Sequence, residues 1–487
     1  MSSPLIHLSD FSDRISPMLV KELRQGMRAK TFIVVFLSLQ VFLAVMLFSA
    51  GAASTSDQVG SVISSIIFTF FSIAVLIIQP LRGTNALSSE VKGNTIDMMV
   101  LTRLSAWRIV YGKWVAIVSQ SALLLTTIIP YLILRYFFGG MNLVTEMTAL
   151  FLIFITSMGV TAVTVGLSGC SSVIIRLLLP VFGLLMLAYM LLVASFGRIG
   201  RSGGIMDFLT LDSTESRIGV AVYIATVVYL GYTMLSLGAS LIAPAAENHA
   251  FPRRLVSVLL VLFILGLSVY DIPATWVLMT CVSIVVIPSI VVALTDSAML
   301  VPTVCKPFVK RGIIGRTLGW FFYPTWNSGV IYSVMISLLG LATIFSAELL
   351  SHTGHMTYGY SDDLVVLFSL LGSLFFPAVW HAFLFRGENQ RLAHYLLLQV
   401  ASFVMLGVLS ILADSMNNGG FLWIFAWHPL AYIAMLTEHS TSRETILSGV
   451  IVVDIAMFLI LLIRGGMETK RSASIIQETR DNLEING

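Results

Sequence analysis

Charged residues are scarce in this sequence. Only 11% of its 487 residues are Asp, Glu, Lys or Arg, whereas 57% are hydrophobic. A soluble domain carries about 25% charged residues, so the composition excludes an ordinary soluble fold and indicates a chain that lies in a lipid bilayer. The formal net charge is only +3, and we expect no nucleic-acid partner.

Cysteine is rare as well. The three cysteines, Cys170, Cys281 and Cys305, lie in or beside apolar runs and show no C-x-x-C spacing. Cysteines in this pattern predict neither a disulfide framework nor a metal site. We interpret them as small buried or membrane-edge residues.

Enzyme signatures are missing from the sequence. It contains no H-E-x-x-H string of a zinc protease, and its G-x-S-x-G string at 200–204 does not join a predicted strand to a helix, as a nucleophile elbow requires. His352 and His355 are three residues apart, but Gly354 between them favours a solvated loop over a metal site. We therefore expect no catalytic residues, no metal and no cofactor in this chain.

Long apolar runs dominate the sequence instead. Runs of roughly 17 to 25 mainly apolar residues predict membrane-spanning helices. The first run begins at Thr31 and is too long for the core of a signal peptide, so we expect it to stay as a span. Thirteen candidates lie at 32–50, 61–81, 109–137, 147–168, 174–196, 218–243, 255–270, 274–295, 324–346, 363–383, 395–413, 421–437 and 446–464.

The distribution of Lys and Arg predicts the orientation. Loops that face the cytoplasm are enriched in these residues. With thirteen spans, 20 of the 28 basic residues fall on the cytoplasmic side; the number rises to 23 if the segment "FLWIFAWHPLAYIAMLT" (421–437) is a re-entrant or interfacial hairpin rather than a span. That segment is short and has His428-Pro429 in its middle. We therefore predict an all-α integral membrane protein with about twelve spans and both termini in the cytoplasm.

The predicted spans divide the chain into four parts. These are a cytoplasmic leader (1–31), a six-span unit (32–243), a second multi-span unit (244–465) and a cytoplasmic tail (466–487). The spans follow a similar spacing in both units, as a degenerate repeat would. The halves share no residue-level similarity, however, and we favour chance agreement.

The leader segment "SPMLVKELRQGMRAK" (16–30) predicts an amphipathic helix. Ser16 can cap it, and Pro17 suits the first helical position. Such a helix lies at the membrane surface with its basic residues facing anionic lipid or a cytoplasmic partner, although a topology signal alone remains an alternative. Leu19, Leu23 and Met27 form the expected apolar face, and Lys21, Arg24 and Arg28 the polar face.

The string "SSEVKGNTIDMMVLTRLSAWRIVYGKW" separates the second and third predicted spans. Gly93 ends one helix, Asn94 or Thr95 can cap the next, and Asp97 completes a capping-box pattern. Ser105 can cap a further helix that continues into the third span. The pattern predicts a helix–break–helix elbow over residues 82–113, suited to pass force from a soluble partner to the spans. An ordinary cytoplasmic loop with good caps is the alternative.

These two segments resemble type-2 ABC transporter permeases of the exporter class. The leader is similar to the "NP-x-x-x-K-E-x-R" string of that family, with Ser16 in place of the asparagine. Asn94 separates the glycine and threonine of the elbow, a small departure from the family pattern. The matching leader residues are Pro17, Lys21, Glu22 and Arg24, and the matching elbow residues are Glu90, Gly93, Thr95, Met98, Met99, Leu101, Thr102, Leu104, Ser105, Gly112 and Lys113.

Two further strings are similar to larger members of the same family. They are "LIAPAAENHAFPRR" (241–254) and, with lower specificity, "WFFYPTWNSGV" (320–330). The resemblance covers residues 16–254 well and the rest of the chain weakly.

The resemblance implies a membrane subunit of an ABC exporter in the cell (inner or plasma) membrane. In that family the leader helix and the elbow contact a separate ABC ATPase, which binds ATP and Mg. This chain has no G-x-x-x-x-G-K-[ST] string of its own. The resemblance also implies contact with membrane lipid and a homodimer or pseudo-dimer. From the resemblance and the capping pattern together, we predict that Glu90, Gly93, Thr95, Asp97, Thr102 and Ser105 carry the coupling and that Lys21, Glu22 and Arg24 lie in the interface helix.

Two other classes remain open. An ion-coupled secondary transporter would place ionisable residues inside its spans, and Asp454 lies within the last predicted span. This aspartate could be a relay, or a buried acid paired with Ser, Thr or backbone. A structural multi-span membrane protein would have a featureless loop between spans two and three, which this sequence does not have.

Overall fold

The chain forms two compact units, Met1–Ile242 and Ala243–Gly487, and their described residues build helices only. The computed structural model describes residues 17–52, 66–93, 105–136, 142–170, 172–178, 180, 183, 211–270, 275–350, 360–384, 391–416, 419–436 and 442–485. These ranges contain no β-strand. The prediction of an all-α protein is confirmed for them.

Eleven helices in the described ranges are long and apolar enough to cross a membrane. They match eleven of the thirteen predicted spans, and a membrane-embedded, multi-span protein is therefore confirmed. The predicted span 174–196 lies mostly outside the described residues, so twelve spans and the sidedness of the termini stay predictions. The eleven are Lys30–Ser49, Ile66–Lys92, Ala106–Leu134, Leu143–Leu167, Ser216–Ile242, Ala250–Ser268, Val277–Thr295, Trp326–Ser346, Asp362–Leu384, Arg391–Leu412 and Arg443–Met467.

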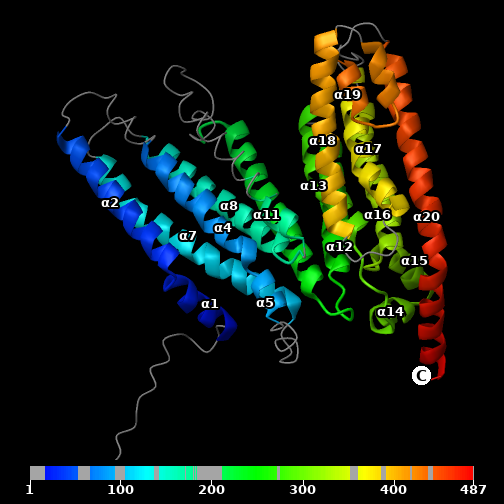
Figure 1. The fold of residues 1–487 in the computed structure, drawn as a ribbon, viewed down its shortest axis with the longest axis horizontal. Coiled ribbons are helices and arrows are strands. Elements are labelled where there is room, and N and C mark those ends of the chain that lie inside the picture. The colour runs from blue at the N-terminus through cyan, green and yellow to red at the C-terminus, as the bar shows by residue number, and fades with distance from the viewer. Residues whose placement is uncertain are drawn as a thin grey trace, which may run out of the picture. The chain divides into compact units, whose positions relative to one another are not determined.

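The first unit is a helical bundle that is preceded in the sequence by a short helix, α1 (Figure 1). Its core joins α2, the second span, α7 and α8 through buried apolar side chains such as Leu43, Phe71, Leu124 and Leu150. Helix α11 packs along α8. Outside the second span, its helical elements are α1 (Pro17–Met27), α2 (Lys30–Ala52), α7 (Ala106–Tyr136), α8 (Leu143–Leu167), η3 (Ile174–Leu178) and α11 (Thr214–Ile242).

The second span changes its helical pitch several times. It passes through a π-helical stretch, η1 (Ile73–Ile78), a turn of α-helix, α4 (Gln79–Leu81), and a 3₁₀ stretch, η2 (Arg82–Asn85), before α5 (Ser88–Lys92). π-helical and 3₁₀ stretches inside a helix often mark functional or strained positions.

The end of this span is held against α8. The Leu87 backbone N–H donates to Ser168 Oγ at 3.1 Å, and Leu87 itself is fully buried. The start of the elbow is therefore tied to the end of α8.

The described residues of the second unit form ten helical elements. Within it α13 packs on α16 and α17 packs on α20, and these helices run side by side in Figure 1. The elements are α12 (Ala250–Tyr270), α13 (Thr275–Thr295), α14 (Pro302–Val309), α15 (Gly312–Phe322), α16 (Trp326–Leu350), α17 (Tyr360–Leu384), α18 (Arg391–Met416), η4 (Gly419–Phe425), α19 (Ala431–Leu436) and α20 (Arg443–Ile485).

Helix α20 is much longer than a span. Its 43 residues correspond to about 65 Å at 1.5 Å per residue, about twice the apolar thickness of a bilayer. The predicted tail 466–487 is therefore the continuation of this helix as far as Ile485. Ile476 of that continuation packs with Phe308 of α14 and Tyr323 in an apolar cluster.

The segment 421–437 does not form a spanning helix. Its residues make the short helices η4 and α19 with a turn between them. Leu422 and Met435, near its two ends, share one core cluster with Val365 near the start of α17. The turn between η4 and α19 lies further along α17, where the centre of the His428 ring is 4.1 Å from the centre of the Phe376 ring. Entry and exit at one end agree with the predicted re-entrant hairpin.

Candidate functional site

Helix α1 lies on α7 with one side turned inward. Leu19, Glu22, Leu23 and Gly26 are half-buried, whereas Lys21, Arg24 and Arg28 are exposed. The predicted apolar face included Met27, but Met27 is 38% exposed. Two steps of four residues rotate a helix position by about 80°, which turns Met27 away from the face that Leu19 and Leu23 share. Glu22 and Gly26 lie on the inward side instead.

Lys113 joins the leader helix to the elbow. Its Nζ lies 3.2 Å from Glu22 Oε1 of α1 and 2.7 Å from Glu90 Oε1 of α5. The lysine side chain, which comes from α7, is only 8% exposed, and the two glutamates are 19% and 15% exposed. One cation therefore holds three segments that lie far apart in the sequence.

Lysines near span ends often reach to the lipid headgroups, but Lys113 does not. Its position on α7 instead faces α1 and α5. A lysine removed from water in this way needs its carboxylate partners, because an unpaired buried charge costs several kcal/mol.

A second polar contact ties α1 to the bundle. Arg82 donates to Gln79 Oε1 at 3.1 Å, to Gln120 Oε1, and to the Gly26 carbonyl oxygen at 3.4 Å. The absence of a side chain at Gly26 is necessary here, since a Cβ would overlap the Gln120 amide. Helix α1 thus approaches α7 as closely as a glycine allows.

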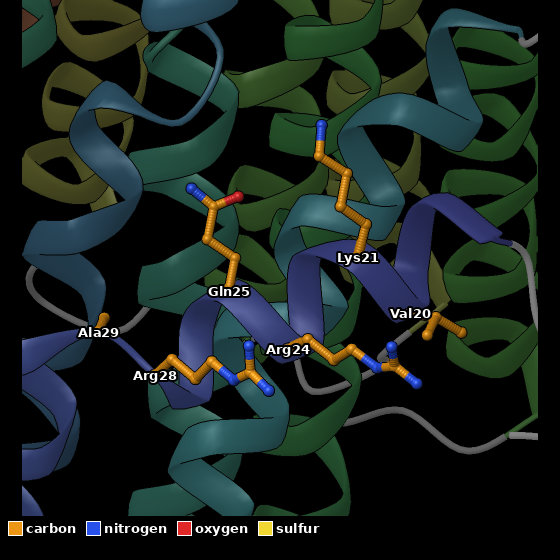
Figure 2. A pocket seen from close by; sticks show the side chains of 6 residues that line it. All are labelled: Val20, Lys21, Arg24, Gln25, Arg28 and Ala29. Atoms are coloured by element: carbon orange, nitrogen blue, oxygen red, sulfur yellow. The ribbon is translucent and has the colours of Figure 1, made fainter. Parts of the chain in front are cut away.

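The outer side of α1 is basic and hollowed. Lys21, Arg24 and Arg28 line an open hollow of about 800 Å³ together with small or uncharged neighbours. Figure 2 shows Arg24 and Arg28 projecting from one edge of the helix and Lys21 from the other. A positive surface of this kind attracts acidic side chains or phosphate groups.

The structure describes three of the six predicted coupling positions. Glu90 meets Lys113, as above. Gly93 ends α5, where its N–H donates to the Ser89 carbonyl oxygen at 3.1 Å. The Ser105 carbonyl oxygen accepts the backbone N–H of Arg108 at 3.0 Å at the start of α7. Thr95, Asp97 and Thr102 lie outside the described residues.

The structure brings some predicted residues together and adds others. Glu22 of the predicted interface helix and Glu90 of the predicted elbow meet on Lys113, while Lys21 and Arg24 stay on the outer side. Arg82 and Gln120 were not predicted as site residues. The available signal was that Arg82 directly follows a predicted span and that Gln120 is a polar residue within one.

The described residues contain no group of three or more His, Cys, Asp or Glu that could hold a metal ion. No protein-family model, no curated protein and no solved structure matches the chain.

Proposed function

We propose that this chain is the membrane permease subunit of an ABC exporter and works with a separately encoded ABC ATPase. The observation that supports this most is the Lys113 bridge. It links Glu22 and Glu90, which belong to the two segments that the resemblance assigns to ATPase contact. An ordinary surface loop is not expected to share a buried lysine with the leader helix.

The bridge offers a route for force. Lys113 lies on α7, which is the third span, so a push on α1 or on the elbow reaches a spanning helix through one residue. Packed helices of this kind shift between discrete arrangements rather than deforming continuously. In the proposed cycle, ATP binding and hydrolysis in the partner move α1 and the elbow together and switch the spans between inward- and outward-facing states.

Several parts of the proposal concern the assembly. ATP and Mg are bound by the partner, and the chain works as a homodimer or a pseudo-dimer with both termini in the cytoplasm of the cell. The basic outer side of α1, with Lys21 and Arg24 exposed, provides the docking surface for an acidic patch of the ATPase.

Reversing the charge of that surface is expected to release the ATPase. In a Lys21→Glu/Arg24→Glu variant, purified in mild detergent, we expect about tenfold less co-purified ABC ATPase than with the wild type, since rim charges govern association. The thermal unfolding of the chain should not change, because both side chains are exposed. The matched control is Lys310→Glu/Arg311→Glu, which reverses two exposed charges in the second unit. If no ABC ATPase accompanies the wild type, the proposal is wrong.

A further inference from the structure

Asp454 is an isolated acid inside a span. It lies in α20 within the apolar stretch Arg443–Met467 and is 3% exposed. Neither of its carboxyl oxygens has a hydrogen-bond partner among the described residues. Of the two interpretations left open by the sequence, pairing with Ser, Thr or backbone is therefore not what the structure contains.

The neighbours of Asp454 come from α17 and from the re-entrant hairpin. At Gly372 of α17, a Cβ would overlap Asp454 Oδ1 and lie 2.9 Å from Pro429 Cγ. The acid, the glycine and the hairpin turn therefore meet at one point.

His428, beside Pro429, is a second polar group without a partner. It is 1% exposed. Its Nδ1 accepts the Leu430 backbone N–H at 3.2 Å, so the neutral ring carries its proton on Nε2. That Nε2 is buried and has no hydrogen-bond partner among the described residues. Two buried polar side chains at the hairpin turn thus have atoms without hydrogen-bond partners among the described residues. Apolar side chains at these positions would avoid the free-energy cost of burying such atoms.

Among the described residues, no Lys, Arg or His forms an ion pair with Asp454. Arg443, at the start of α20, is engaged by Asp362 Oδ1 at 3.2 Å and by the Leu436 carbonyl oxygen at 2.6 Å. On α20 the nearest charged residues are Glu444 and Arg464, each ten residues from Asp454, and apart from Arg443 the others lie in the continuation beyond Arg464. The elements packed on α20 carry Asp363 and His381 near the ends of α17, Tyr332 and Glu348 on α16, Lys306 on α14, and Tyr432 and His428 of the hairpin.

An ionised carboxylate in such surroundings is strongly disfavoured, and the group takes up a proton instead. Asp454 also belongs to no group of three or more His, Cys, Asp or Glu that could hold a metal ion among the described residues. The occupant that fits is a single proton.

We propose that Asp454 is a proton-binding site whose occupancy is linked to the seating of the hairpin turn His428-Pro429. With the turn seated, the carboxyl group is neutral. When the turn withdraws and water enters, the O–H bond breaks, the proton passes to water and a carboxylate remains. Reseating the turn takes up one proton. This site is independent of the proposed partner ATPase.

The test is infrared spectroscopy of the full chain in lipid nanodiscs without any ATPase. We expect a protonated-carboxyl C=O band at neutral pH that is lost in Asp454→Asn and kept in Glu444→Gln, an exposed acid on the same helix. In the wild type the band should give way to a carboxylate band at alkaline pH. A wild type without this band at neutral pH, or a band that appears only when Na⁺ is removed, would overturn the proposal.

Thermal unfolding gives an independent readout. The folded wild type holds a proton that the unfolded chain releases, so its stability should fall as the pH rises. Asp454→Asn should remove this fall and unfold no earlier than the wild type at neutral pH. Earlier unfolding of the Asn variant at neutral pH would show a paired carboxylate and contradict the proposal. The wild-type pH series remains informative even if the variant fails to fold. Because no ATPase is present, failure here is distinct from failure of the proposed function.

Discussion

Replacing Lys113 by methionine is expected to lower the free energy of unfolding by about 3 kcal/mol, since removing one partner of a buried ion pair costs 3–5 kcal/mol. The variant removes the cation that both Glu22 and Glu90 contact, and their side chains are only 19% and 15% exposed. The lower end of the range applies because both glutamates keep some contact with water. If the proposed coupling is right, ATP hydrolysis in the complex would also lose its response to the permease.

The measurement is thermal unfolding in nanodiscs, with Lys92→Met as the control. Lys92 is an exposed lysine of the same elbow, and its replacement should leave stability unchanged. A Glu22→Gln/Glu90→Gln/Lys113→Met variant removes all three charges and should recover most of the lost stability, because the penalty comes from unpaired charges. Equal stability of Lys113→Met and wild type would show that the bridge contributes nothing.

Replacing Asp296 by asparagine is expected to have the largest effect in the second unit. Asp296 Oδ1 lies 2.8 Å from Arg253 Nη2, and Asp296 Oδ2 lies 2.8 Å from Arg254 Nη2. The three side chains are 8%, 2% and 1% exposed. Without the carboxylate, two adjacent guanidinium groups remain buried and repel each other. We expect a loss of about 5 kcal/mol and little folded protein in the membrane.

Further hydrogen bonds hold Arg254 in place, so we do not expect it to move away from Arg253 in the Asp296→Asn variant. It also donates to the carbonyl oxygens of Phe321 and Tyr323, at 2.8 and 3.0 Å, and to Ser328 Oγ at 3.1 Å. These contacts fix Arg254 at the junction of α12, α15 and α16.

The experiment compares membrane yield and detergent-unfolding midpoints. Asp363→Asn, which changes an exposed aspartate, is the control and should behave as wild type. Adding Arg253→Met to Asp296→Asn removes one of the two unpaired charges and should restore part of the yield. Normal yield and stability of Asp296→Asn alone would contradict the account of this cluster.

The spans were predictable because their signal is local. A run of about 20 apolar residues has the length and composition of a helix that crosses the bilayer. For this reason eleven predicted spans reappear in the described residues. The hairpin could also be predicted from the sequence, since Pro429 in the middle of a short apolar run opposes a continuous helix.

The site was only partly predictable because its contacts are long-range. Glu22 and Lys113 are 91 residues apart in the sequence, and no local pattern tells which of several lysines turns inward. The same holds for Gly372, which looks like any span glycine until Asp454 and Pro429 are seen against it. The face of α1 was mistaken at Met27 because residues four apart were counted without the rotation that accumulates between them.

The central claim is that the outer side of α1 receives an ABC ATPase. The most direct measurement places a photo-reactive amino acid at position 21, or at position 310 as the control, and identifies the cross-linked product in native membranes by mass spectrometry. The account predicts that position 21 yields an adduct with a polypeptide that carries G-x-x-x-x-G-K-[ST], and that position 310 does not. Adducts at position 21 with lipid alone, or with no ATP-binding polypeptide, would contradict it.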